Sequence, residues 1–167
     1  MSKQAIHIID FTKPTEHQKW LAINDNVMGG ISIGQLTYDG KSCQYQGELS
    51  LVNNGGFSSI KRSLEPLTKE VNTVKLVFVG DGRSYQLRLT MWKDGSPIQY
   101  KHEFSTIKGK SQQKTFNLID FQAVFRGRLL SEAPELIAND IKYVGFLIAD
   151  KQTQAFSLNL FQIQFTA

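Results

Sequence analysis

The chain has 167 residues, of which 41% are hydrophobic and 20% are charged. This length is typical of one domain and the composition is typical of a globular protein, so we expect a single domain over residues 1–167 rather than a disordered chain. Nineteen basic and fifteen acidic residues give a net charge of +4, without any run of lysine or arginine. This charge pattern disfavours nucleic acid as a partner.

Cys43 is the only cysteine, which excludes an internal disulfide and favours a reducing compartment. No histidine lies near Cys43 in the sequence, so a buried, inert thiol is expected rather than a nucleophile. Residues 1–7 lack the apolar run of a signal peptide, and no segment approaches the roughly 20 apolar residues of a membrane helix. We therefore expect a cytoplasmic protein without a membrane span.

Along the chain, apolar residues alternate with polar ones or form short runs between turn residues, which predicts strands rather than helices. Only residues 15–21 and 133–138 are expected to form short helical turns. The parity of the last apolar segment shifts between Leu160 and Phe161, which predicts a β-bulge. About ten short strands without a major helix indicate an all-β sandwich or barrel. The strands are expected at 6–11, 36–38, 44–45, 47–52, 57–61, 73–79, 85–91, 98–104, 114–117, 143–149 and 156–165.

Two pairs of these strands are expected to form hairpins. Residues 47–52 and 57–61 flank an Asn-Asn-Gly-Gly turn, and Asn-Gly is the strongest short hairpin signal because both residues accept positive φ angles. Residues 73–79 and 85–91 flank the turn Gly-Asp-Gly in the same way. The long segments 12–35 and 118–142 are expected to be irregular.

The segment 20–34 is the first candidate binding loop, because it combines amides and glycines with large apolar side chains. Amide and carboxylate groups would supply hydrogen bonds, and Trp20 or Met28 an apolar contact. The alternative is a structural loop whose Trp20 closes one end of the sandwich. A single Asp25 is too few carboxylates for calcium, so no metal site is predicted. The candidate residues of this loop are Trp20, Asn24, Asp25, Asn26, Met28, Gly29 and Gly30.

Further candidates lie in other predicted turns. Arg83 follows the turn 80–82 and Arg126 lies in the second long loop, where an arginine contacts an anion or a protein; the alternative is a local pair, for Arg83 with Asp81 or another loop carboxylate. Tyr85 follows Arg83 directly. The remaining candidates are the turn residues Asn53, Asn54, Gly55 and Gly56.

No catalytic constellation is recognisable. His7, His17 and His102 lack metal-ligand spacing, and the chain contains no Gly-x-Ser-x-Gly elbow, phosphate loop or dinucleotide fingerprint. We therefore expect no cofactor and no enzymatic activity, although carboxylates distant in sequence could still meet in the fold.

Several stretches together resemble one known family. They are Trp20-x3-Asn24-Asp25-Asn26-Val27-Met28-Gly29-Gly30, then Gly47-x-Leu49-Ser50-Leu51-x-Asn53-Asn54-Gly55-Gly56-Phe57, Gly80-Asp81-Gly82-Arg83-x-Tyr85, Phe121-x4-Arg126-Gly127-Arg128 and Val144-Gly145-Phe146. This combination is similar to the complex I intermediate-associated protein 30 family. The resemblance implies a galactose-binding-like jelly-roll sandwich, a fold similar to carbohydrate-binding modules, and a non-enzymatic role as an assembly factor.

Two functional hypotheses follow. The first is a protein-binding or assembly module that uses the 24–32 loop, the 53–56 turn and Arg83. The alternative is a carbohydrate-binding module, for which the candidate aromatic platforms are Trp20, Tyr85, Trp92 and Tyr100.

Overall fold

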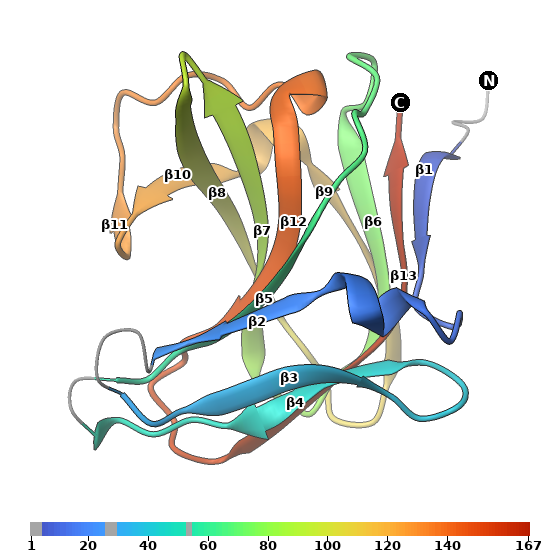
Figure 1. Ribbon diagram of the computed structural model, residues 1–167, viewed down its shortest axis with the longest axis vertical. Helices are drawn as coiled ribbons and strands as arrows, with labels where there is room; N and C mark the ends of the chain where they lie inside the picture. Colours follow the sequence, from blue (N-terminus) through green and yellow to red (C-terminus); the bar gives the residue numbers. More distant parts are fainter. Residues whose placement is uncertain (1–4, 26–29, 53–54) are drawn as a thin grey trace.

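The computed structural model describes residues 5–25, 30–52 and 55–167 (Figure 1). Two antiparallel sheets pack face to face, which confirms the predicted all-β sandwich. In the described chain one sheet has the order β3-β4-β13-β6-β9, with β1 also paired to β13, and the other has the order β11-β10-β8-β7-β12-β5-β2. The first sheet comprises β1 (Ala5–Asp10), β3 (Ile33–Tyr38), β4 (Cys43–Glu48), β6 (Thr73–Val79), β9 (Ser111–Asn117) and β13 (Ala155–Thr166).

The second sheet has seven strands in the described chain. They are β2 (Leu21–Asn24), β5 (Ser58–Ser63), β7 (Ser84–Lys93), β8 (Ser96–Ser105), β10 (Gln122–Phe125), β11 (Arg128–Leu129) and β12 (Ile141–Ile148). Helical structure is limited to single 3-10 turns among the described residues, so none is long enough to cross a membrane. These turns are η1 (Glu16–Lys19), η4 (Leu118–Asp120) and η5 (Ala138–Asp140).

A core of alternating apolar side chains fills the space between the sheets. In β6 the residues Leu76 and Phe78 are fully buried, and in β7 the same is true of Leu87 and Leu89. The side chains between them in each strand point away from the core, as period-two alternation requires. Burial of each such side chain stabilises the fold by about 1.5–3 kcal/mol.

The predicted bulge in the last strand is confirmed. The register between β13 and β6 shifts between Leu160 and Gln162, and the buried set changes parity there, from Leu160 to Ile163. The bulge allows one strand to join two neighbours on the same side: the first half of β13 pairs with β4 and the second half with β1.

Both predicted hairpins are wrong. β6 pairs with β13 and β9, whereas β7 pairs with β12 and β8 in the opposite sheet. β4 and β5 are likewise in different sheets. A glycine-rich turn marks where the chain reverses but not which sheet receives the next strand, and inward-facing apolar residues look alike from both sheets. The glycine-rich segments are therefore crossings of the sandwich, that is, connections that carry the chain from one sheet to the other.

One hairpin forms at the turn 93–97, which the sequence placed between two expected strands, whereas several short elements were not predicted. β7 and β8 are joined by a tight turn in which Asp94 and Gly95 both have positive φ. β2, β10 and β11 lie within the segments expected to be irregular, because strands of two to four residues show little alternation. The helical turn expected at 15–21 occurs as η1, whereas the one expected at 133–138 is displaced to η5.

Candidate functional site

Asp25 lies directly after β2 and is fully buried. Its carboxylate accepts hydrogen bonds from the backbone N–H and the hydroxyl of Ser32, at 2.8 and 2.6 Å. It also accepts one from the N–H of Gly56 at 2.6 Å, and a longer one from Phe57 at 3.4 Å. The side chain thereby joins two loops that are far apart in the sequence.

The structure explains why the positions around Asp25 are occupied by glycine. A Cβ atom at Gly30 or Gly55 would lie within 3.0 Å of the Asp25 carboxylate, so only glycine fits there without displacing the acid. Gly56 has a φ of 129°, which favours glycine for its backbone conformation alone. These three candidate residues are thus explained by packing and turn geometry.

Asn24 is also held from inside the fold. Its Oδ1 accepts a hydrogen bond from the Ser58 hydroxyl at 2.7 Å, and its Nδ2 donates to the carbonyl of Gly34 at 3.3 Å. The Tyr45 hydroxyl donates to the same Ser58 oxygen at 3.0 Å. The network links β2 and β5 of one sheet to β3 and β4 of the other.

Arg83 is buried at the crossing that follows β6, with 8% of its side chain exposed. Its guanidinium donates hydrogen bonds to the Asp150 carboxylate from Nε (2.7 Å) and Nη2 (2.5 Å), which together form a bidentate ion pair. It also donates to the carbonyls of Gln152, Gln154 and Ala155. The structure thus pairs Arg83 with a loop carboxylate, as the structural alternative expected.

Tyr85 faces the core beside this crossing. Its hydroxyl donates to Asp81 Oδ2 at 3.0 Å, and the same oxygen accepts the N–H of Ser157 at 2.8 Å. Burial, followed by the nearby negative charge of Asp81, raises the pKa of Tyr85 well above its usual value. Tyr100 is buried too, so neither tyrosine offers a face to a sugar.

The remaining candidates divide into packed and exposed positions. Trp20 packs on Phe11 and Phe146, with ring centroids 5.5 and 5.9 Å apart, and its Nε1 donates to Glu16. Arg126 sits with a φ of 50° in the exposed turn between β10 and β11. The candidates Asn26, Met28, Gly29, Asn53 and Asn54 lie outside the described residues.

An exposed apolar cluster borders the loops that Asp25 joins. The hydroxyl oxygen of Ser32 accepts the Ser50 N–H at 2.8 Å and lies 3.1 Å from the Ser50 carbonyl oxygen, so the segments that flank these two serines lie together. We call the exposed apolar residues of these segments the end patch; sequence reasoning missed them because it weighed the polar residues. The end patch consists of Ile31 (59% exposed), Ile33 (64%), Leu51 (45%) and Val52 (53%).

A second surface that the sequence did not single out is the outer face of the seven-stranded sheet, which we call the open face. Its side chains alternate with the buried core positions of the same strands, and the strand register places them in rows. Arg88 lies in the middle, where its Nε and Nη1 donate to Gln86 and Gln99. The open face consists of Lys61, Gln86, Arg88, Thr90, Gln99, Lys101, Glu103, Tyr143, Gly145 and Leu147.

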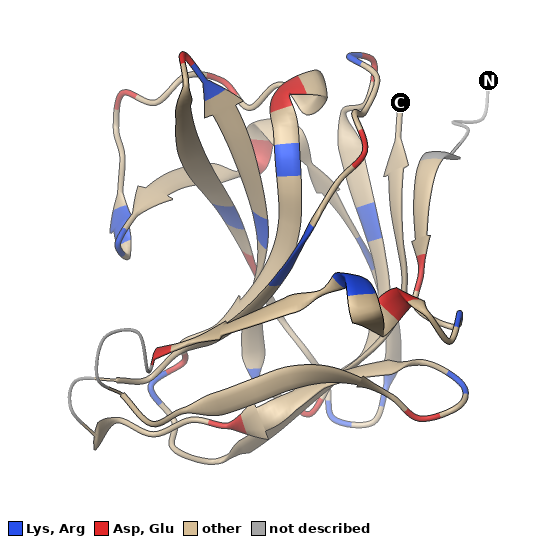
Figure 2. Ribbon diagram, viewed as in Figure 1, with Lys and Arg blue, Asp and Glu red and all other residues tan. Residues whose placement is uncertain are grey.

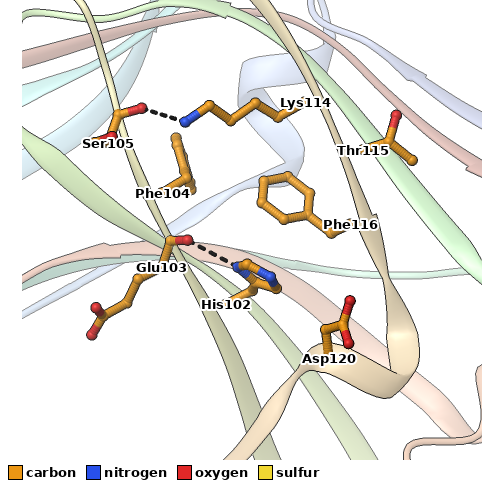
Figure 3. A pocket seen from close by; sticks show the side chains of 8 residues that line it. All are labelled: His102, Glu103, Phe104, Ser105, Lys114, Thr115, Phe116 and Asp120. Atoms are coloured by element: carbon orange, nitrogen blue, oxygen red, sulfur yellow. Dashed lines mark hydrogen bonds between the residues drawn. The ribbon is translucent and has the colours of Figure 1, made fainter.

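A hollow of about 360 Å³ lies between β8 and β9 (Figure 3). His102 is held there against the rings of Phe116 and Phe121, and its Nδ1 lies 2.9 Å from the carbonyl of Glu103. Lys114 donates to the carbonyl of Ser105. Asp120 lies on the rim, and no hydrogen bond joins it to His102 among the residues drawn in Figure 3.

Neither metal binding nor thiol chemistry finds support in the described part of the chain. No group of three or more His, Cys, Asp or Glu side chains is arranged there to hold a metal ion. Cys43 is fully buried, and burial raises the pKa of its thiol to about 11, as expected for an inert cysteine. Figure 2 shows acidic and basic residues interspersed over the visible strands and loops.

Solved structures place the fold in a recognised class. The family 11 carbohydrate-binding module of Clostridium thermocellum, in complex with a β-1,3-1,4-mixed-linked tetrasaccharide, has a TM-score of 0.68 at 8% identity, over 93% of both chains. The mannan-recognising module TmCBM27 has a TM-score of 0.53 at 10% identity, over 99% of this chain and 98% of that one. The protein therefore has the jelly-roll fold of carbohydrate-binding modules.

The sequence itself defines the family. The family model of complex I intermediate-associated protein 30 (CIA30) matches residues 9–160, so the chain belongs to that family, as the motifs indicated. An uncharacterized protein of Schizosaccharomyces pombe is 27% identical in an alignment 150 residues long, which covers 78% of this chain and 68% of that protein.

Removal of the Asp25 carboxylate is expected to destabilise the fold. In Asp25→Ala the buried N–H groups of Ser32 and Gly56 lose their acceptor, which costs about 2–4 kcal/mol. For a chain of this size the melting temperature falls by about 5–15 °C. Calorimetry measures this, with Glu65→Ala, an exposed carboxylate, as the control. A variant that melts with the wild type would contradict the structural role.

Asp25 also predicts how stability depends on pH. Burial opposes its charge, but the hydrogen bonds from Ser32, Gly56 and Phe57 outweigh burial and hold its pKa below the usual value. A lowered folded pKa adds stability that is complete above the unfolded pKa of about 3.9 and is lost as the pH falls through the folded pKa. Urea denaturation from pH 6 to pH 3 should therefore show a smaller loss for Asp25→Asn than for wild type or Glu65→Gln. An equal loss of stability between pH 6 and pH 3 in Asp25→Asn and in the wild type would refute this prediction.

The ion pair of Arg83 gives a separate prediction. Asp150→Asn leaves a buried guanidinium without its anion, which costs about 3 kcal/mol. The control is Glu103→Gln, whose carboxylate pairs with Lys101 but is 65% exposed, so its loss costs less than about 1 kcal/mol. Denaturation midpoints compare the two variants, and equal midpoints would count against the bracing role of Arg83.

Proposed function

We propose that this protein is a non-catalytic binding module that recognises a protein partner through its end patch. The observation that carries the proposal is that four exposed aliphatic residues flank the two loops tied together by Asp25 and Ser32. Exposed apolar residues that gather in one place on a soluble domain are typical of interaction sites. Membership of a family described as complex I intermediate-associated agrees with a protein partner.

The framework under the end patch favours binding. Because hydrogen bonds hold Ser32, Ser50 and Gly56 in place, the segments beside them lose little conformational entropy when a partner docks. Asn24 and Asp25, which the sequence suggested as direct contacts, support the surface from beneath instead. The module thus presents aliphatic side chains on a polar internal frame.

The test is site-specific crosslinking in cells. A photo-reactive amino acid at position 33 should give a discrete crosslinked product, whereas the same residue at position 119 should not, because Ile119 is 78% exposed but belongs to η4, between β9 and β10, and not to the segments of the end patch. Mass spectrometry identifies the product, and titration with the purified partner should show at least tenfold weaker binding for Leu51→Lys than for Ile119→Lys. Identical crosslinks at both positions, or equal affinities, would refute the proposal.

A second candidate function is carbohydrate binding on the open face. The face offers amides, a guanidinium and the ring of Tyr143 side by side, which are the groups that bind sugar hydroxyls and rings. Structures with this fold include a module in complex with a β-1,3-1,4-mixed-linked tetrasaccharide and a module that recognises mannan.

Affinity electrophoresis through soluble polysaccharides tests the second candidate. If the open face binds sugars, at least one gel should retard the wild type, and Tyr143→Ala should abolish the retardation. Phe125→Ala is the matched control, because Phe125 is an exposed aromatic at the end of β10. Absence of retardation in a panel of neutral and acidic polysaccharides would exclude this function.

A further inference from the structure

Arg88 is fixed in an unusual way for an arginine on a sheet surface. Its Nε donates to the side-chain oxygen of Gln86 at 2.8 Å, and its Nη1 donates to that of Gln99 at 2.7 Å. A guanidinium has only donors, so both amides must turn their oxygens toward it. Their NH₂ groups remain as donors, and the centre of the open face is therefore rich in donors.

The strand register surrounds Arg88 with positive charge. Lys101 of β8 lies directly opposite Arg88, and on the other side Gly145 of β12 separates Arg88 from Lys61 of β5. A row of three cations thus crosses four strands. The acidic member of the open face is Glu103, which already accepts a hydrogen bond from Lys101 at 2.9 Å.

No carboxylate pairs with Arg88 among the described residues. Their ion pairs involve Glu16, Asp150 and Glu103 as acids, and none includes Arg88. Arg88 is nevertheless partly withdrawn from water, and this burial lowers its pKa to about 10. A partly buried cation without an anion is costly, and a bound anion removes that cost.

Gly145 leaves one side of Arg88 without a side chain. A Cβ atom there would meet the backbone carbonyl of Ile60 at 2.5 Å, so close strand packing accounts for the glycine. The consequence for the open face is that Lys61 and Arg88 have no side chain between them in this row. Tyr143 and Leu147 are the next outward residues of β12 on either side.

We propose that the open face contains a carboxylate-binding subsite centred on Arg88, and that the saccharides it binds are acidic, with a uronic acid at this position. A carboxylate matches the planar fork of a guanidinium and accepts two parallel hydrogen bonds from it. The free NH₂ groups of Gln86 and Gln99 are placed to donate to ring hydroxyls. This inference rests on the second candidate function, carbohydrate binding.

The experiment compares a charged probe with a neutral one in which a methyl group caps each carboxylate. Tri-galacturonic acid and its fully methyl-esterified form have the same sugar skeleton, and calorimetric titration at constant ionic strength measures both. The free acid should bind at least tenfold more tightly than the ester. Arg88→Gln should lose at least tenfold affinity for the acid with little change for the ester, and Arg88→Lys should fall between, since it keeps the charge without the fork.

Control measurements distinguish failure of the carboxylate subsite from failure of carbohydrate binding. Arg128→Gln, on the exposed strand β11, should bind like wild type, and the melting temperature of each variant reports its folding. Acid and ester binding with equal affinity would overturn the carboxylate subsite but leave carbohydrate binding intact. Failure of both probes and of all polysaccharides would overturn carbohydrate binding itself. If acetate shifted the NMR signal of the Arg88 Nε–H as strongly as the sugar acid did, the saccharide part would be refuted.

Discussion

The buried carboxylate of Asp25 is the interaction on which this end of the fold depends. Within the described chain it has no cationic partner, and its charge is balanced by N–H and O–H donors of Ser32 and Gly56. Such a charge tolerates burial only while the donors stay in place, and the donors stay in place because the charge attracts them. The arrangement of the two segments and the stability of the buried ionised carboxylate therefore depend on each other.

Buried polar side chains also hold the connection between the sheets that follows β6. The Arg83–Asp150 pair ties the segment after β6 to the segment before β13, and the carbonyl of Gln154 accepts from both Arg83 and the N–H of Leu49. The crossings cannot use the regular ladder hydrogen bonds of a sheet, so buried polar side chains satisfy their backbone groups instead. This explains why Asp25 and Arg83 are buried.

That arrangement changes where function is sought. A jelly-roll fold by itself does not define a ligand, and here the polar candidates Asp25 and Arg83 are buried rather than exposed. Two surfaces that are open to partners are the aliphatic end patch, beside the residues that Asp25 holds, and the open face, whose central arginine pairs with no carboxylate among the described residues. The two differ in chemistry, since one offers apolar contact and the other donors and positive charge.

The sequence by itself determined the class of fold, most of the strands and the family. Period-two alternation places Leu76 and Leu87 in the core wherever their strands pair, and the parity change after Leu160 requires a bulge in any sheet. These are local properties, so local patterns report them.

Only the tertiary structure decided which sheet each strand joins and which polar residues remain available. The glycine-rich turns before β5 and β7 look like hairpin signals, because a reversal within one sheet and a crossing between sheets need the same flexible residues. Asp25 is a potential ligand group in the sequence and an internal tie in the fold, because Ser32 and Gly56 converge on it only after the sandwich closes. Arg88 became notable for the same reason: its neighbours Lys61, Gln99 and Lys101 come from strands that only strand pairing brings together.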